Sequence, residues 1–168
     1  RLVISEPADV IASPFGWHDT NGLIGPEFTT TQGNNVHAYT DTNADNLPDP
    51  GSSPDGGGGL DFLFPLDLTQ PPSAYRPAAV TNLFYWNSYI HDFAYFYGFD
   101  EVNGNFQENN YGNGGLGSDY VNAEAQDGSG TNNANFATPP DGSNPRMQMY
   151  IGTNPTPDVD GDFDNGVI

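Results

Sequence analysis

One segment of this sequence, Pro77–Tyr97, repeats large apolar residues with a helical period, and it constrains the fold more than any other feature. The spacings of 3, 4, 3 and 4 place these residues on one face of an α-helix. They are Leu83, Trp86, Ile90, Phe93 and Tyr97. Further aromatic residues surround this face, so we expect the helix to be covered on more than one side. Gly98 is expected to end it, because glycine adopts left-handed backbone angles without steric cost.

Outside this helix the chain is rich in turn-forming residues, with 21 glycines and 15 prolines. Short β-type runs lie between the turns and are strand or extended-segment candidates. They are Leu2–Ile4, Phe28–Thr31, Phe62–Leu68, Tyr120–Ala125 and Arg146–Ile151. The length of 168 residues suits a single domain. We therefore predict one α+β domain over residues 1–168, with an irregular β-sheet and one long, aromatic-rich helix.

The charge balance excludes several classes of partner. Lys and Arg total 3 against 22 Asp and Glu, which gives a net charge of −19 and repels nucleic acids and anionic membranes. No run approaches the ~20 apolar residues that would span a bilayer, and the first residues lack the apolar core of a signal peptide. Aromatic residues make up 13% of the chain, which favours a folded domain over a disordered one.

An acidic, glycine-rich loop at residues 41–59 is the first candidate binding site. The chain has no cysteine, so neither disulfides nor thiolate metal sites can hold such a loop. Oxygen side chains stand at positions 1, 3, 5 and 9 of a calcium-type loop, with a backbone carbonyl at position 7. The predicted calcium ligands are Asp41, Asn43, Asp45, Leu47 and Asp49. The alternative is a solvated loop of Asx turns, since Asn46 and Ser52 depart from the twelve-residue pattern.

A second acidic stretch near the other end alternates carboxylates in the same way. Asp158, Asp160 and Asp162 are predicted as a weaker calcium site, with full solvation as the alternative. A chain rich in Asp, Asn and Gly and poor in Lys fits the calcium-replete extracellular fluid. We therefore expect a secreted protein.

The residues alone assign no catalytic centre. His18, His37 and His91 lie in separate segments without paired spacing, so a zinc site built from them is not predicted. No cysteine or Gly-x-Ser-x-Gly motif supplies a nucleophile, and the glycine-rich runs lack the Lys and Ser/Thr of a phosphate loop. His91 and Asp92 are expected to orient one another. The carboxylates of Glu101, Glu108 and Glu124 are interpreted as solvated surface groups.

Several longer motifs spread over nearly the whole chain form a pattern of their own. They are Ala12–Asp19, Thr31–Val36, Leu83–Trp86, His91–Asp92, Tyr97–Asp100, Gly104–Gln107, Ala125–Gly142 and Arg146–Ile151. Together they resemble the fungalysin family of secreted zinc metallopeptidases, which is similar in catalytic architecture to the thermolysin-like enzymes. The resemblance implies that the chain is the N-terminal lobe of a thermolysin-like catalytic unit.

The resemblance also implies where the zinc chemistry lies. In the family, a stretch like Asp160–Phe163 leads into a helix with the motif His-Glu-x-x-His, whose histidines and a downstream Glu bind zinc while the first Glu activates water. This sequence contains no His-Glu pair. The zinc ligands and general base are therefore expected outside this chain, in a C-terminal lobe, and the chain alone is expected to be inactive.

The resemblance assigns this chain the role of presenting substrate. Asn133 and Ala134 match the edge-strand segment that holds an extended peptide, Asn133 through its side chain and Ala134 through its backbone. From the residues alone, Asn132, Asn133 and Asn135 are equally well read as turn residues at a strand end. The alternative function is a non-catalytic, calcium-binding structural or adhesive extracellular module derived from a peptidase fold.

Overall fold

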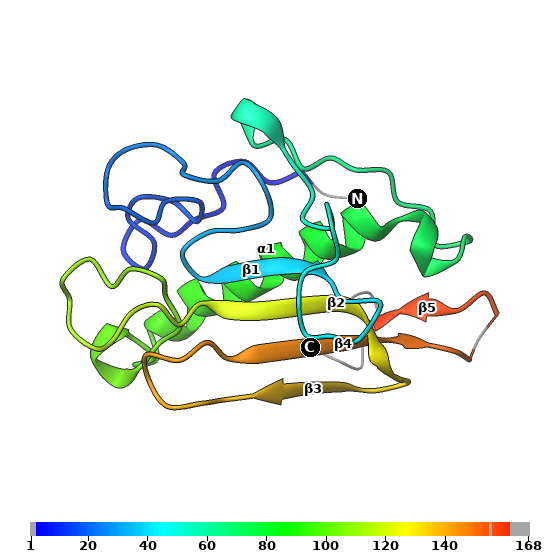
Figure 1. Cartoon of the computed structure of the whole chain (residues 1–168). Coiled ribbons are helices and arrows are strands. Elements are labelled where there is room, and N and C mark those ends of the chain that lie inside the picture. Colours follow the sequence, from blue (N-terminus) through cyan, green and yellow to red (C-terminus); the bar gives the residue numbers. More distant parts are fainter. Residues whose placement is uncertain (1–2, 155, 162–168) are drawn as a thin grey trace.

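The structure is a computed structural model, and it describes residues 3–154 and 156–161. It consists of one long helix on one face of a curled mixed sheet, with long loops at the ends of the strands (Figure 1). The predicted α+β architecture is confirmed. No helix among the described residues is long and apolar enough to cross a membrane.

The long helix, α1, spans Arg76–Tyr95. It begins one residue before the predicted start and ends two residues before the predicted end. Pro77 lies in the first turn, where the missing N–H leaves no helical hydrogen bond unmade. Gly98 has a φ of 92°, the left-handed conformation predicted for it, and its N–H donates to the Tyr95 carbonyl at 3.1 Å.

In the described part of the chain, five strands form the sheet in the order β1-β2-β4-β3, and β5 pairs with the end of β4. They are β1 (Val36–Thr40), β2 (Val121–Thr131), β3 (Ala134–Ala137), β4 (Arg146–Gly152) and β5 (Val159–Asp160). The β1, β2 and β4 strands are parallel, whereas β3 and β5 run antiparallel to β4. Short 3₁₀ turns lie at Gly57–Gly59 (η1), Pro72–Ala74 (η2) and Glu101–Asn103 (η3).

The sequence located β4 and the first half of β2, but three extended candidates are not strands. The described part of Leu2–Ile4 is irregular, and Phe28–Thr31 contributes only an isolated bridge between Thr30 and Asp55. Phe62–Leu68 pairs with no described strand. Its apolar alternation instead reflects ring packing, because the Phe62 ring stacks on His18 with ring centroids 5.4 Å apart.

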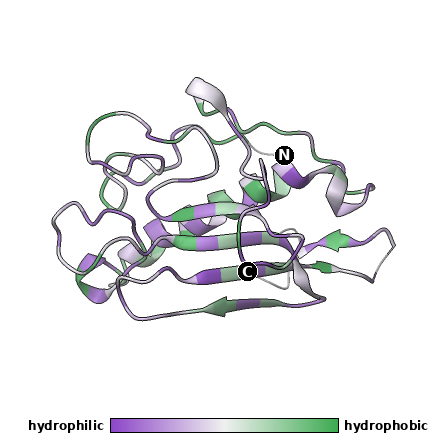
Figure 2. Ribbon diagram, in the orientation of Figure 1, coloured by the Kyte–Doolittle hydropathy of each residue, from purple (hydrophilic) through white to green (hydrophobic). Residues whose placement is uncertain are grey.

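The sheet has one apolar and one polar face. Alternate residues of the strands pack with α1 in a single buried cluster, which contains Trp17, Val36, Ala38, Val80, Leu83, Phe84, Val121, Ala123, Ala125 and Met149. Figure 2 shows hydrophobic and hydrophilic residues alternating along β1, β2 and β4. Because successive strand residues point to opposite faces, Tyr39, Glu124, Arg146 and Gln148 lie on the face away from α1.

Backbone hydrogen bonds hold the acidic loop at residues 41–59 against the domain. The Gly56 N–H donates to the Thr29 carbonyl at 2.8 Å, and the Asp49 N–H donates to the Thr40 carbonyl at 2.9 Å. Gly128 of β2 approaches so closely that a Cβ there would lie 2.3 Å from the Thr42 carbonyl oxygen. Glycine at position 128 therefore allows the loop and β2 to meet.

Asp92 of α1 anchors the N-terminal segment to the helix. Its buried carboxylate accepts hydrogen bonds from Trp17 Nε1 at 2.7 Å, Ser13 Oγ at 2.6 Å and the Asp9 backbone N–H at 2.9 Å. His91 Nδ1 lies 3.0 Å from the same carboxylate, which confirms that the two side chains orient one another. Burial raises the pKa of Asp92, but the hydrogen bonds from these four residues outweigh it and hold the pKa below its ordinary value.

Candidate functional site

The β3 strand offers an open edge for a peptide. It is the last strand in the order β1-β2-β4-β3 and pairs with β4 on one side only among the described residues (Figure 1). Three of its four residues are exposed. An unpaired edge presents a row of backbone N–H and C=O groups to which an extended chain can add as a further strand.

The pairing of β3 with β4 shows which backbone groups face outward. The Tyr150 N–H donates to the Asn133 carbonyl at 3.3 Å, so the Asn133 carbonyl points toward β4. Because hydrogen-bonded and free residues alternate along an antiparallel pair, the backbone groups of Ala134 and Phe136 point to the free edge. The predicted role of Ala134, to supply backbone groups, is compatible with this orientation.

The three asparagines around the start of β3 have different environments. Asn132 has a φ of 56° and exchanges two hydrogen bonds with Thr153, as expected of a turn residue. Asn135 donates to Gln148 Oε1 at 2.8 Å within the sheet. The Asn133 side chain is exposed and makes no hydrogen bond to the part of the chain that the structure describes. The turn interpretation therefore fits Asn132 and leaves the amide of Asn133 available to a ligand.

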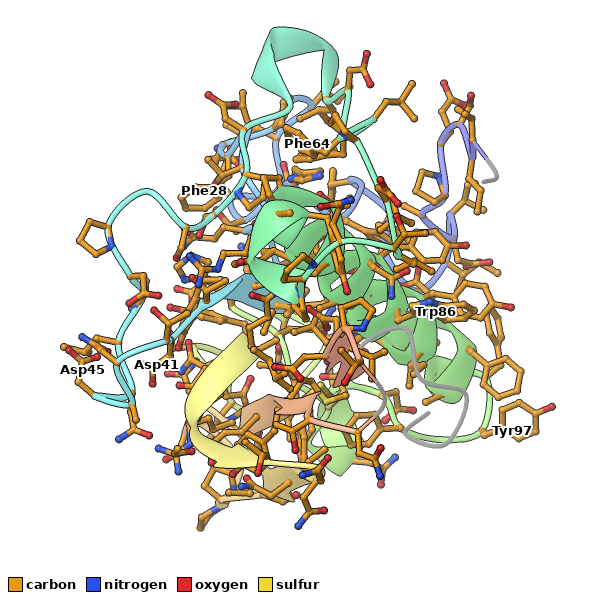
Figure 3. All side chains as sticks on the ribbon, turned by 90° about the vertical axis from the view of Figure 1, so that its right-hand side faces the viewer. Phe28, Asp41, Asp45, Phe64, Trp86 and Tyr97 are labelled. Atoms are coloured by element: carbon orange, nitrogen blue, oxygen red, sulfur yellow. The ribbon has the colours of Figure 1, made fainter. Side chains whose placement is uncertain are left out.

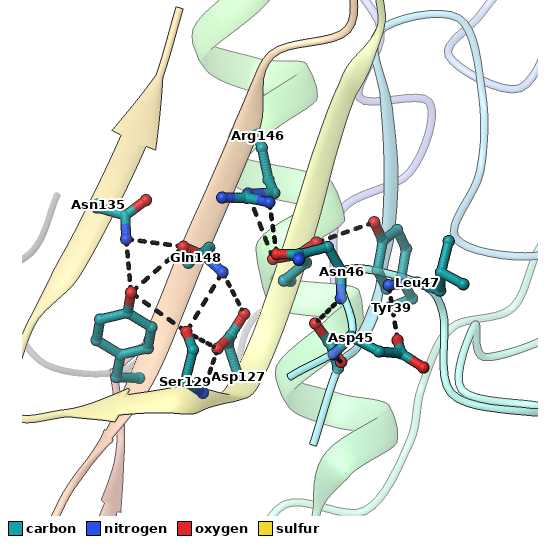
Figure 4. A network of polar contacts seen from close by, with 12 residues as sticks. Tyr39, Asp45, Asn46, Leu47, Asp127, Ser129, Asn135, Arg146 and Gln148 are labelled. Atoms are coloured by element: carbon teal, nitrogen blue, oxygen red, sulfur yellow. Dashed lines mark hydrogen bonds and ion pairs between the residues drawn. The ribbon is translucent and has the colours of Figure 1, made fainter. Parts of the chain in front are cut away.

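A chain of polar contacts crosses the sheet and fixes this edge (Figure 4). Asn135 of β3 bonds Gln148 of β4, whose Nε2 donates to Asp127 Oδ2 in β2 at 2.7 Å. Asp127 also accepts from the Ser129 N–H at 2.6 Å, which shapes the end of β2. Burial raises the pKa of Asp127, but the hydrogen bonds from Ser129 and Gln148 reverse the effect and lower it overall. The edge strand is thus linked by side chains to the centre of the sheet.

An open pocket of about 480 Å³ lies on the polar face near the far end of β3. It is lined by Tyr39, Asn46, Asn122, Glu124, Ala137, Thr138, Pro139, Asn144 and Arg146. Neither Asn133 nor Ala134 is among these residues. The pocket therefore adjoins the end of β3 that is opposite to the predicted substrate residues.

Three buried carboxylates meet beside this pocket. Asp41, Glu124 and Asp127 each place an oxygen within 4.8 Å of the other two. Burial, with the nearby Asp127, raises the pKa of Glu124 to about 7, while Arg146 opposes that rise. Arg146 Nε lies 3.9 Å from Glu124 Oε2, which accepts no hydrogen bond from the residues that the structure describes. Three hard oxygen ligands suit calcium far better than zinc.

The acidic loop contributes one of its predicted calcium ligands to this group. Asp41 is fully buried and accepts hydrogen bonds from the backbone N–H groups of Asp45 at 3.1 Å and Asn46 at 2.8 Å. Asp45 accepts from the Leu47 N–H at 3.0 Å, and Asn43 Oδ1 accepts from the Asp45 N–H at 3.3 Å. These are the Asx-turn bonds of the alternative interpretation.

Among the described residues, the remaining predicted calcium ligands do not belong to the group of Asp41, Glu124 and Asp127. Asp49 accepts hydrogen bonds from the Thr40 and Thr42 hydroxyls at 2.9 and 2.7 Å and closes the loop. Asp158 is exposed, whereas Asp160 is buried and accepts from Gln126 Nε2 at 2.6 Å. Asp162 lies outside the described residues.

The histidines do not form a zinc site within residues 3–154 and 156–161. His18 Nδ1 lies 3.1 Å from the Gln32 carbonyl, His37 Nε2 lies 2.9 Å from Ser53 Oγ, and His91 bonds Asp92. No histidine belongs to a cluster of metal ligands in this described part. The side chains present here therefore do not fit zinc.

Acid is expected to destabilise the fold through His37. Burial lowers the pKa of His37 to about 4, against 6.5 ordinarily. Between pH 4 and pH 6.5 the unfolded chain binds more protons at His37 than the folded chain does. The free energy of unfolding is therefore unaffected by this group above pH 6.5 and decreases as the pH falls toward 4. We expect the Tm of the native protein to fall more between about pH 7 and pH 4.5 than that of His37→Gln, which cannot titrate. Thermal unfolding followed by circular dichroism checks this, and parallel curves would contradict it.

Two carboxylates of this region are buried, contrary to the prediction. Glu124 and Glu101 were interpreted as solvated, but they are 0% and 4% exposed. The alternation in Tyr120–Ala125 did place Glu124 opposite to the core residues, yet it could not show that Glu124 is buried beside Asp41 and Asp127. No pattern in the sequence identified Asp127 or Arg146 as site residues.

Comparisons with known proteins bear on the whole chain. The model of the family described as fungalysin metallopeptidase (M36) matches residues 1–168. An extracellular metalloproteinase mep of Aspergillus fumigatus is 44% identical over 173 residues, and one of Aspergillus flavus is 46% identical over 175 residues; each match covers 100% of this chain and 26% of the relative. Extracellular metalloproteinase 2 of Trichophyton tonsurans is 43% identical over 156 residues, which cover 93% of this chain and 24% of the relative. The chain thus spans about a quarter of the length of these relatives.

Proposed function

Because this chain belongs to the fungalysin family of metallopeptidases, we propose that it forms the substrate-presenting N-terminal lobe of a secreted, zinc-dependent endopeptidase. The observation that carries the proposal is the open edge of β3, with outward backbone groups at Ala134 and a free side-chain amide at Asn133. The relatives named extracellular metalloproteinases support both the peptidase role and secretion. The zinc ligands and the general base belong to a C-terminal lobe outside this chain.

The residues of this chain bind and align the peptide. An extended substrate adds to β3 as a further strand, with main-chain hydrogen bonds to Ala134 and Phe136. Asn133 hydrogen-bonds a peptide group of the substrate. These contacts fix the scissile bond in one position largely independently of the substrate side chains, so broad sequence specificity follows. Cleavage itself is assigned to the C-terminal lobe.

An activity assay of the complete protein tests this function. We expect hydrolysis of an unfolded protein substrate, its loss on treatment with a zinc chelator, and its recovery when zinc is restored. Complete protein that binds zinc but cleaves no peptide would contradict the proposal. That result would favour the alternative, a non-catalytic calcium-binding structural or adhesive module, which the buried Asp41 group supports.

We also propose that calcium binds at Asp41, the residue shared by the predicted loop and the buried acidic group. Asn43, Asp45, Leu47 and Asp49 are the further ligands predicted from the sequence, and Asp158, Asp160 and Asp162 stay a weaker prediction. The net charge of −19 favours a cation wherever carboxylates are buried together.

Calcium is expected to raise the Tm of the protein. An ion that binds only the folded state stabilises it by about 2.7 kcal/mol at 100 times its Kd. Asp41→Asn should abolish the rise, whereas Asp61→Asn, at an exposed carboxylate, should retain it. Differential scanning calorimetry with and without millimolar calcium measures the effect. An unchanged Tm, or an equal rise in Asp41→Asn, would contradict the proposal.

Two further variants identify the other ligands. If the acidic loop supplies the other ligands, Asp45→Asn should reduce the rise in Tm with calcium. If the sheet supplies them, Asp127→Asn should reduce that rise.

A further inference from the structure

One side of α1 is left uncovered by the described residues. The helix packs against β1 and β2 through side chains such as Val80, Leu83 and Phe84. The opposite side carries six large exposed residues, which we call the aromatic stripe. They are Trp86, Tyr89, Ile90, Phe93, Phe96 and Tyr97. Figure 3 shows Trp86 and Tyr97 projecting from the same side of the helix.

The aromatic stripe is continuous. Its residues recur every three or four positions along the second half of α1 and the two residues after it, which places them in one row about 16 Å long. Neighbouring rings are in contact: the centroids of Trp86 and Tyr89 are 5.6 Å apart, and those of Phe93 and Tyr97 are 5.0 Å apart. Single exposed apolar residues are common on protein surfaces, but a contiguous row of this size indicates an interaction site.

The charge pattern supports the same conclusion. The chain as a whole has 25 Asp, Glu, Lys and Arg residues, yet between Pro77 and Phe99 only Asp92 carries a formal charge, and it is buried. The solvent-exposed face of a surface helix normally carries charged residues. The aromatic stripe carries no charged side chain, and the exposed fractions of its residues reach 54% at Phe93 and 78% at Tyr97.

We propose that the aromatic stripe is the surface on which the metal-bearing C-terminal lobe packs. The inference rests on the proposed function. The relatives extend well beyond the quarter of their length that this chain matches, so they have the polypeptide needed to cover the stripe. Docking on the far side of α1 leaves the free edge of β3 open to peptide. A second copy fits less well, because it carries the same net charge of −19.

Hydroxyl-radical footprinting of the complete secreted protein tests the proposal. Oxidation is read by mass spectrometry and corrected for the intrinsic reactivity of each residue type. Leu23 and Ile24, which are 70% and 101% exposed, serve as references in the same chain. We expect Phe93 and Tyr97 to be oxidised at least ~10 times more slowly than the rates that their exposed fractions in this structure predict. Oxidation at the reference level would overturn the proposal.

Dilution separates the two occupants. Packing within one polypeptide gives protection that does not change over a hundredfold dilution, whereas protection that is lost on dilution would indicate a second copy and overturn the proposal. Peptide hydrolysis is measured on the same sample. Hydrolysis with an unprotected stripe overturns this inference alone, and a protected stripe without hydrolysis overturns the proposed function alone.

A substitution provides an independent measurement. Tyr97 lies past the end of α1, so Tyr97→Ser should leave the helix and the core intact. In the complete protein we expect it to shorten the half-life of activity at elevated temperature at least ~10-fold, because the packed lobes separate more readily. Leu23→Ser should change the half-life less than ~2-fold. Equal half-lives for the two variants would contradict the docking role.

Discussion

Replacing Asn133 with alanine is expected to lower kcat/KM of the complete protein about 10- to 100-fold. The side-chain amide of Asn133 is exposed and makes no hydrogen bond within the described chain, so in its proposed role its loss removes contacts to substrate and not contacts of the fold. One well-placed hydrogen bond to a peptide group contributes about 1 to 3 kcal/mol, which corresponds to this range of rate. Steady-state kinetics on a peptide substrate, with Tm measured in parallel, gives the result.

Asn135→Ala is the matched control for this variant. Asn135 lies two residues further along the same edge, but its side chain is bonded to Gln148 within the sheet. Its loss is expected to lower Tm while changing kcat/KM less than about 3-fold. If Asn133→Ala, like Asn135→Ala, lowered Tm and left kcat/KM nearly unchanged, Asn133 would be a turn residue and not a substrate contact.

Replacing Asp92 with alanine is expected to lower the free energy of unfolding by about 3–5 kcal/mol. The carboxylate is 5% exposed and is the common acceptor for Trp17, Ser13 and the backbone of Asp9, so its removal leaves several buried donors without a partner. Urea unfolding followed by tryptophan fluorescence measures the loss, and Trp17 itself reports on the site.

Two further variants separate the hydrogen bonds of Asp92 from its volume. Asp92→Asn keeps the shape of the side chain but leaves only one oxygen that can accept a hydrogen bond. We expect it to lower the free energy of unfolding by about half as much as Asp92→Ala does. Asp61→Ala removes an exposed carboxylate and should change the free energy of unfolding by less than about 0.5 kcal/mol. A loss below about 1 kcal/mol in Asp92→Ala would contradict the anchoring role.

The sequence predicted those parts of the fold that depend on local pattern. Helix α1 was found within two residues because its apolar period is long and is followed by Gly98. Strand β4 was found because Met147 and Met149 alternate with polar residues. These signals are carried by neighbouring residues and do not require knowledge of tertiary contacts.

Long-range pairing explains what the sequence missed. Strand β1 pairs in parallel with β2, with Val36 opposite Val121, and no local pattern joins segments so far apart. The continuation of β2 to Thr131 depends on register shifts against β4. The acidic group unites Asp41 with Asp127 across the same distance, so the predicted loop of five ligands contained only one member of the cluster that forms.

The aromatic stripe shows how a correct local prediction can have a non-local cause. Aromatic residues around the circumference of α1 led us to expect cover on more than one side. Within the described residues the sheet covers one side and the N-terminal segment covers a second, where Trp17 packs on Tyr85, while the aromatic stripe stays exposed. We expect a helix with such an exposed apolar side to be covered in the complete protein. The proposed packing of a C-terminal lobe on α1 thus explains why the fold of this chain leaves the residues of the aromatic stripe exposed.

A crystal structure of the complete protein with a peptide-like inhibitor, held by a zinc-binding group, would show whether substrate binds along the edge of β3. We expect the inhibitor to lie along β3 as an added strand, with main-chain hydrogen bonds to Ala134 and a bond from the Asn133 side chain to one of its peptide groups. An inhibitor bound to zinc without contact to β3, or a β3 edge that is already paired with another part of the polypeptide, would contradict it.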